Sequence, residues 1–255
     1  MRYLDFLRTV HERLAPKAYL EIGVRNGNSL ALASCRAVGI DPAFAIHAEL
    51  DGEVALFRTT SDEYFSRPEP LAATRGQRFE LCFIDGLHLF EFALRDFIFA
   101  ERHSSARGVI LFDDVLPRNV AEAARERHTH QWTGDVFGVL QVLERYRPDL
   151  LVVPLDTEPT GLLAVVGLDP ESTVLVDHFE EILAEFRRPD PQPVPGEILD
   201  RISVVAPGRF LDAGVLELLA GQPSDVSAAG LAPSLRPLVG ERLGSGFLTR
   251  PGLTG

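Results

Sequence analysis

The sequence predicts an α/β fold: a doubly wound, Rossmann-like sheet of seven mostly parallel strands, with a C-terminal antiparallel hairpin strand and a C-terminal extension. Over the first half of the chain, short apolar runs alternate with helical patterns, which is typical of parallel strands joined by helices. Two later apolar runs, 150–155 and 162–168, are separated by a short turn, and such a turn requires antiparallel pairing. The length of 255 residues and a hydrophobic content of 45% suit one domain with a substantial core.

The individual elements follow from periodicity. Apolar runs predict parallel strands at 18–23, 53–59, 79–85 and 108–114, and one more strand that ends at 39–42. Amphipathic patterns predict helices at 2–14, from Ser29 to about Ala37, after Thr60, at 89–103, near 119–130, at 136–146 and at 174–187.

The chain divides into residues 1–170, which carry the sheet, and residues 171–255. The proline-rich stretch 187–197 cannot form a helix or a central strand and is expected to be an extended linker. Residues 198–255 show one short helical pattern near 212–220 among many Gly, Pro and Ser residues. Three interpretations stay open for this part: an arm that wraps a partner subunit, a lid, or a partly disordered tail. We expect a homo-oligomer.

The formal net charge of -12 argues against nucleic acid or an anionic membrane as a partner. No apolar run is long enough to span a bilayer, and the N-terminal segment lacks the apolar core of a signal peptide. Cys35 and Cys82 are expected to be reduced thiols, which indicates a cytoplasmic protein.

A glycine-containing turn joins the first strand to the next element, with the spacing E-x-G-x-x-x-G from Glu21 to Gly27. Gly23 and Gly27 permit close approach of a ligand, and Ser29 is placed to cap a following helix. The pattern lacks the G-x-G-x-x-G of dinucleotide sites. Asp41 ends the second strand, where an acid accepts hydrogen bonds from ribose hydroxyls. The alternative is an ordinary tight turn.

Two apolar strands end abruptly in acids, FIDGLH at 83–88 and LFDDV at 111–115. Because ligands bind at the carboxyl ends of strands, we expect Asp85, Asp113 and Asp114 to meet at one edge and to bind Mg²⁺ or Mn²⁺. His88 then suits a general base. The alternative is that one or more of these acids caps a helix or turn, and that His88 faces solvent.

The motifs YLEIGVRNGNS (19–29) and GIDP (39–42) resemble those of class I S-adenosylmethionine-dependent methyltransferases, over roughly residues 1–170. This resemblance implies that the glycine loop lines the methionine and ribose part of the cofactor and that Asp41 binds the ribose. Glu21 would support the loop, and Ser61 with Asp62 would approach the adenine. The expected cofactor-binding residues are Glu21, Gly23, Gly27, Ser29, Asp41, Ser61, Asp62 and Asp85.

The motifs IDGLH, FDDV and GDVFGVL (134–140) further resemble the metal-dependent sugar O-methyltransferases of macrolide biosynthesis and their cephalosporin-hydroxylase-like relatives. The resemblance implies that the three acids hold the metal and that the DGxH histidine is the base. Many relatives have a second acid where Leu87 stands, so the substrate class is open. The expected catalytic residues are His88 and Asp85, and the expected metal ligands are Asp85, Asp113 and Asp114.

Weaker candidates surround this motif. His128, His130 and Trp132 either line an acceptor pocket or form a polar turn, while Glu91 and Asp96 are expected on a solvated helix face.

The predicted function is O-methylation of a small-molecule acceptor, a sugar or other hydroxylated natural product of secondary metabolism. Two alternatives stay open: a metal-assisted, hydroxylase-like reaction on the same fold, and a non-catalytic cofactor-binding or scaffold protein.

Overall fold

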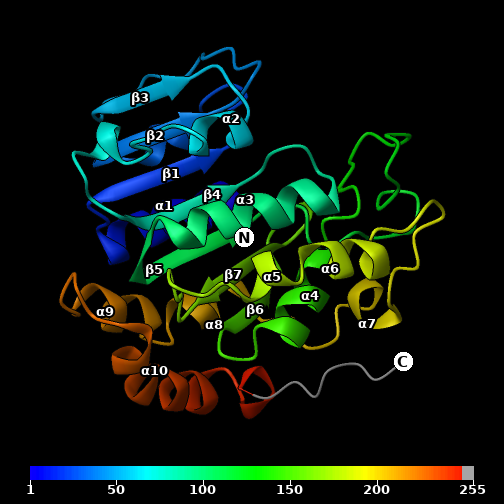
Figure 1. Cartoon of the computed structure of the whole chain (residues 1–255). Coiled ribbons are helices and arrows are strands. Elements are labelled where there is room, and N and C mark those ends of the chain that lie inside the picture. The colour runs from blue at the N-terminus through cyan, green and yellow to red at the C-terminus, as the bar shows by residue number, and fades with distance from the viewer. Residues whose placement is uncertain (249–255) are drawn as a thin grey trace.

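A single seven-stranded sheet forms the centre of the computed structural model, which describes residues 1–248. Its order is β3-β2-β1-β4-β5-β7-β6 (Figure 1). The first five strands run parallel, whereas β7 pairs antiparallel with both β5 and β6, so the predicted fold class is confirmed. The strands are β1 (Ala18–Ile22), β2 (Arg36–Ile40), β3 (Val54–Phe57), β4 (Phe79–Ile84), β5 (Ser104–Phe112), β6 (Leu151–Leu155) and β7 (Leu162–Val166).

Helices cover both faces of the sheet and divide the hydrophobic core into two clusters. The cluster on one face includes side chains from α2 (Ser61–Phe65), α3 (Phe90–Arg102), α4 (Gly138–Tyr146), α5 (Val174–Asp177), α6 (Phe179–Phe186) and α7 (Gly196–Leu199). The cluster on the other face includes side chains from α1 (Tyr3–Leu14), α8 (Pro207–Leu211), α9 (Val215–Ala220) and α10 (Ala228–Arg242). In β1, Leu20 belongs to the first cluster and Tyr19 to the second, as alternation along a strand requires.

The helix expected from Ser29 to Ala37 is wrong. Only a 3₁₀ turn, Leu30–Leu32, forms there, because β2 already begins at Arg36 and pairs with Ala18 of β1. The hydroxyl of Ser29 donates a hydrogen bond to Glu21 at 2.8 Å and makes no helix cap. Arg36 and Ala37, the last residues of the expected helix, therefore pair with β1 instead.

The helix expected near 119–130 is also wrong, and its backbone groups bond to distant partners instead. The carbonyl of Glu122 accepts hydrogen bonds from the amides of Thr133 and Gly134. The amide of Arg125 donates to the carboxylate of Asp190 at 3.0 Å. These tertiary hydrogen bonds replace the helical ones. The connection between β5 and α4 therefore forms a long loop that extends beyond the carboxyl ends of the strands (Figure 1).

The C-terminal part contains more helix than its sequence suggests. The helix expected over 174–187 is divided into α5 and α6 at His178, and α10 was not predicted because Pro233 and Pro237 lie inside it. The helices α8 to α10 bury Phe210, Leu216 and Leu235 in the same cluster as α1. A short 3₁₀ turn, Ser245–Phe247, follows α10.

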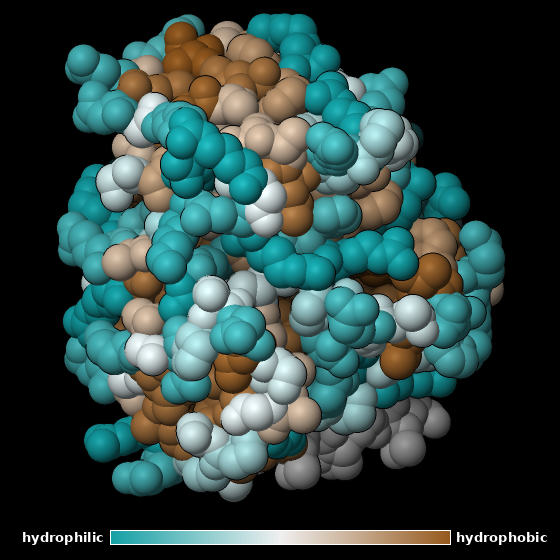
Figure 2. Space-filling model, turned by 60° about the vertical axis from the view of Figure 1, so that its left-hand side comes forward, coloured by the Kyte–Doolittle hydropathy of each residue, from teal (hydrophilic) through white to brown (hydrophobic). Residues whose placement is uncertain are grey.

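The surface is largely hydrophilic, with smaller apolar areas between polar residues on the face that Figure 2 shows. Cys35 and Cys82 are both free thiols. None of the helices within residues 1–248 has the length and apolar character that a transmembrane span requires.

The buried His11 on α1 is expected to make the free energy of unfolding depend on pH. Its side chain is 7% exposed and meets the edge of Tyr19, with ring centroids 4.7 Å apart, and burial lowers the pKa of the imidazole from 6.5 to about 4. The unfolded chain therefore binds more protons between these values. We expect the free energy of unfolding to be highest above pH 6.5 and to fall by about 3 kcal/mol as the pH drops towards 4.

Urea unfolding of His11→Leu across this pH range checks the expectation. The variant should lose most of this slope, whereas His47→Leu, at an exposed position, should keep it. An unchanged slope in His11→Leu would assign the acid sensitivity to other groups.

Candidate functional site

The glycine loop lies directly against the end of β4. Gly23 has φ +91°, and a Cβ atom at this position would lie 1.9 Å from the carbonyl oxygen of Asp85. Gly27 has φ +84°, also in the left-handed region. Any side chain at position 23 would push the two connections apart, so the glycine brings the loop and the acid-bearing strand end together.

Glu21 contacts the glycine loop through the hydroxyl of Ser29. It is fully buried, and its carboxylate accepts hydrogen bonds from the hydroxyls of Tyr19 at 2.7 Å and Ser29 at 2.8 Å. Burial raises the pKa of Glu21 to about 8, against the effect of these two hydrogen bonds. The carboxyl group is therefore largely neutral at pH 7, and a cationic ligand nearby would favour its ionised form.

Asp41 braces the loop with its carboxylate. One oxygen accepts from the amides of Val24 and Arg25 at 3.0 and 2.7 Å, and the other accepts from the amide of Ala43 at 2.6 Å. A carboxylate accepts about four hydrogen bonds, so roughly one position is left for a ribose hydroxyl. Asp41 thus has a structural task that the sequence did not reveal.

The residues expected near the adenine have partners on α3. Asp62 forms an ion pair with Arg95 at 3.1 Å, and the side chain of Ser61 is hydrogen-bonded to Asp96. Asp96 is 4% exposed, and burial raises its pKa to about 7. Glu91 is 8% exposed as well. The expectation that Asp96 and Glu91 lie on a solvated face is therefore wrong.

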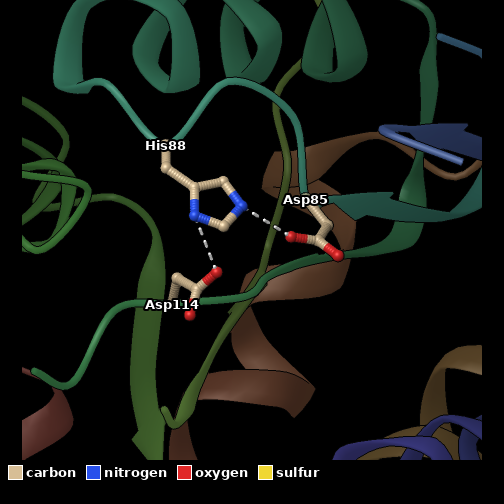
Figure 3. A group of neighbouring side chains, drawn as sticks. All are labelled: Asp85, His88 and Asp114. Carbon is tan, nitrogen blue, oxygen red and sulfur yellow. Dashed lines mark hydrogen bonds and ion pairs between the residues drawn. The ribbon is translucent and has the colours of Figure 1, made fainter. Parts of the chain in front are cut away.

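The carboxyl ends of β4 and β5 bring three polar side chains together, as Figure 3 shows. The possible ligand atoms of Asp85, His88 and Asp114 all lie within 4.8 Å of one another. His88 lies between the two acids: its Nε2 is 3.1 Å from Oδ1 of Asp85, and its Nδ1 is 3.1 Å from Oδ2 of Asp114.

The surroundings of His88 decide which ring nitrogen carries a proton. Nδ1 also lies 3.0 Å from the backbone carbonyl of Trp132, and a carbonyl can only accept. Nδ1 therefore donates, and Nε2, which lies 3.1 Å from a carboxylate oxygen of Asp85, donates as well, so both ring nitrogens carry protons. Nε2 can accept a proton or bind a cation only after it has lost its own proton. Burial lowers the pKa of His88, but the hydrogen bond to Asp85 and the charge of Asp114 raise it further, to about 9.

The backbone at the cluster adopts conformations that most residues avoid. His88 has φ 53° and Asp114 has φ 61°, both in the left-handed region. Gly134 has φ +57°, and a Cβ atom there would lie 1.7 Å from the carbonyl oxygen of His88. The long loop before α4 thus holds the histidine in place, which is a typical use of strained backbone at functional sites.

Asp113, unlike Asp114, has no ion pair with His88 among the described residues. Its Oδ1 accepts from the amide of Asp114 at 2.8 Å and lies 3.4 Å from the hydroxyl of Thr160. Burial raises its pKa well above the usual value, and the charges of Asp114 and Asp85 raise it further. Asp113 lines the same hollow as Asp85 and His88. The group of ligand atoms that the structure brings together nevertheless contains His88 where the sequence indicated Asp113.

Two aromatic residues also belong to this site. The ring of Trp132 stacks on His88 with centroids 5.1 Å apart. Tyr3 stacks on Phe83 in β4, and its phenol has a raised pKa because of burial and then of the charges of Asp113, Asp85 and Glu21. The sequence suggested Trp132 only weakly and Tyr3 not at all. The neighbouring His128 and His130 are exposed, which favours their interpretation as a polar turn.

The donor set suits a divalent cation. Two carboxylates and one imidazole nitrogen match Mn²⁺ as well as Mg²⁺, because oxygen donors select hard cations and imidazole widens the choice.

Residues 20–115 match the family model described as "Methyltransferase domain". This segment of the chain is therefore similar to a methyltransferase domain. This segment contains the glycine loop, Asp41, Asp85, His88 and both acids after β5, and the resemblance to class I methyltransferases is confirmed. No curated protein sequence matches the chain.

The chain is similar to several solved structures, each with low sequence identity. An O-methyltransferase from Bacillus cereus in complex with SAH is 18% identical, with a TM-score of 0.49, covering 64% of this chain and 80% of that one. The O-methyltransferase TomG from Streptomyces achromogenes, in complex with SAM, is 16% identical, with a TM-score of 0.48, covering 64% and 78%. The SAH-bound methyltransferase PaMTH1 from Podospora anserina is 15% identical, with a TM-score of 0.48, covering 64% and 77%.

Proposed function

We propose that this domain transfers a methyl group from S-adenosylmethionine to a hydroxyl of a sugar or other hydroxylated natural product, with the help of Mg²⁺ or Mn²⁺. The observation that carries the proposal is the cluster of Asp85, His88 and Asp114 beside the glycine loop of a methyltransferase domain. An acid–histidine–acid cluster at the ligand edge of such a sheet suits deprotonation of a hydroxyl.

The residues of the chain divide the work. Nε2 of His88 accepts the proton of the acceptor hydroxyl, while Asp114 and the carbonyl of Trp132 hold Nδ1–H and so fix the ring orientation. Glu21 and Asp41 hold the glycine loop in the shape that receives the cofactor. The bound cofactor supplies the electrophilic methyl group, and the protein supplies position and electrostatics.

Asp85 and Asp114 are the residues that would hold the cation, with Asp113 lining the same hollow as Asp85. A cation there would offset the charge of the acids and favour the ionised form of a nearby hydroxyl. It would also counter the effect of both carboxylates on His88 and bring the pKa of the imidazole down from about 9.

Removal of metal tests this part directly. We expect EDTA to abolish transfer of a labelled methyl group to hydroxylated acceptors and Mn²⁺ to restore it. Electron paramagnetic resonance should show Mn²⁺ binding at least about tenfold weaker in Asp85→Asn and Asp114→Asn, because each removes one ligand oxygen. Asp5→Asn on exposed α1 is the matched control.

Three outcomes would contradict the proposal at different points. Methyl transfer that survives EDTA excludes the metal. Equal Mn²⁺ binding by all variants would show that the cation does not bind to Asp85 and Asp114. Absence of S-adenosylmethionine binding in calorimetry excludes methyl transfer itself. The proposal also includes a cytoplasmic homo-oligomer: free thiols support the compartment, and light scattering tests the assembly.

A further inference from the structure

Arg125 lies at the centre of a buried ion cluster behind His88. Its guanidinium forms a two-point hydrogen bond with Glu91, at 2.6 and 3.0 Å, and also donates to Asp135. The side chains of Arg125, Glu91 and Asp135 are only 17%, 11% and 3% exposed. Burying three charges costs free energy, so a cluster of this kind needs a reason beyond stability.

The two acids connect Arg125 to the start of the helix that follows His88. Glu91 stands in the first turn of α3, three positions after His88. Asp135 accepts a hydrogen bond from the amide of Phe90 at 2.7 Å, at the first residue of α3. Arg125 thus offsets the charge of Asp135, whose carboxylate accepts from the first amide of α3. This hydrogen bond fixes the position at which the backbone after His88 begins the helix.

The same loop holds the ring of His88. Gly134, next to Asp135, touches the carbonyl of His88, and Trp132 stacks on its ring and accepts from Nδ1. The indole nitrogen of Trp132 in turn donates to the carbonyl of Ala124, the neighbour of Arg125, at 2.6 Å. Every contact that orients His88 from this side therefore comes from a segment that begins and ends at the ion cluster.

A second segment, which contains Asp190, bonds to the backbone of Arg125. The carboxylate of Asp190, in the proline-rich stretch, accepts from the amide of Arg125 through both oxygens at 3.0 Å. The side-chain amide of Gln192, which is 4% exposed, donates to the same carboxylate at 2.9 Å. The stretch expected to be a linker therefore acts as a strap on the loop.

We propose that Arg125 is a positioning residue, which sets the orientation of His88 through Asp135 and Glu91. The proposal rests on the proposed function only in treating His88 as the base. A planar guanidinium is needed because it bonds to two carboxylates at once in fixed directions, which the single ammonium of lysine does less well.

The test compares Arg125→Met and Arg125→Lys with Arg145→Met. Arg145 is 46% exposed and pairs with Glu185 between α4 and α6, so its loss removes an ion pair away from His88. Nitrogen chemical shifts of the His88 ring and fluorescence of Trp132, the one tryptophan of the chain, report on the site without any substrate.

We expect Arg125→Met to change both signals, and to lower kcat by about 10- to 100-fold with KM for the cofactor within about twofold. Arg125→Lys should recover part of each change, and Arg145→Met should show none. If Arg125→Met does not fold, Asp135→Asn removes the charge while its amide oxygen still accepts from Phe90, and it should reproduce the changes.

A folded Arg125→Met or Asp135→Asn with unchanged His88 shifts and Trp132 fluorescence would overturn the proposal. Both signals come from the protein without substrate, so they test the role of Arg125 even if no methyl transfer is found. The activity assay tests the proposed function separately.

Discussion

Replacing His88 by alanine is expected to reduce methyl transfer by about 10²- to 10⁴-fold while cofactor binding stays within about twofold. The reason is that Nε2 of His88 would become the proton-accepting atom once a cation on Asp85 and Asp114 lowers the pKa of the imidazole, because Nδ1–H stays bonded to Asp114 and to the carbonyl of Trp132. The glycine loop, with Glu21 and Asp41, does not depend on this side chain. Single-turnover rates and calorimetric titration with S-adenosylmethionine check the two parts.

The substitution leaves Asp85 and Asp114 without the positive charge between them, so His88→Gln serves as a second variant that keeps a polar side chain. His130→Ala is the matched control because it changes an exposed histidine of the neighbouring loop. If both His88 variants transfer methyl groups at more than a tenth of the normal rate, His88 is not the base.

Gly134→Ala is expected to damage the site and the fold together. The added Cβ would lie 1.7 Å from the carbonyl oxygen of His88, and φ +57° disfavours any side chain. Because backbone rather than a flexible side chain is in the way, either the loop or the start of α3 must move. We expect a loss of about 3 kcal/mol or more in the free energy of unfolding, and a loss of activity on the order of 10²-fold from displacement of His88.

Gly76→Ala separates the two causes of this damage. Gly76 has φ +79° but nothing within 4 Å of an added Cβ atom, so only the backbone strain applies, about 1 kcal/mol. Urea unfolding followed by fluorescence of Trp132 measures both variants. Equal destabilisation of the two would show that the contact between Gly134 and His88 is unimportant.

The sheet was predictable because its signals are local. Each strand contains a short, mostly apolar run, and acids that follow β4 and β5 predict the edge where ligands bind. Parallel pairing then placed Asp85 and the acids after β5 next to one another without further information. The helix expected near 119–130 is missing for the opposite reason: the amide of Arg125 bonds to Asp190 and the carbonyl of Glu122 accepts from Thr133 and Gly134, partners that lie outside a helical turn.

The division of roles within the site could not be read from the sequence. Asp113 and Asp114 are adjacent, yet only Asp114 forms an ion pair with His88, whereas Asp113 accepts from the amide of Asp114. Asp96 has the spacing of a surface acid, and only the packing of α3 shows that it is buried against Ser61.

The sequence by itself determined the class of sheet, the methyltransferase motifs and the edge at which acids collect, since all three depend on the order of residues along single strands. Only the tertiary structure decided that His88 lies between Asp85 and Asp114, that Gly134 and Trp132 hold it, and that Arg125 stands behind both. The contacts of His88 with Trp132 and of Glu91 with Arg125 join residues 44 and 34 positions apart. The partners lie in an irregular loop without periodicity, so these contacts form only when the sheet brings the loop and α3 together.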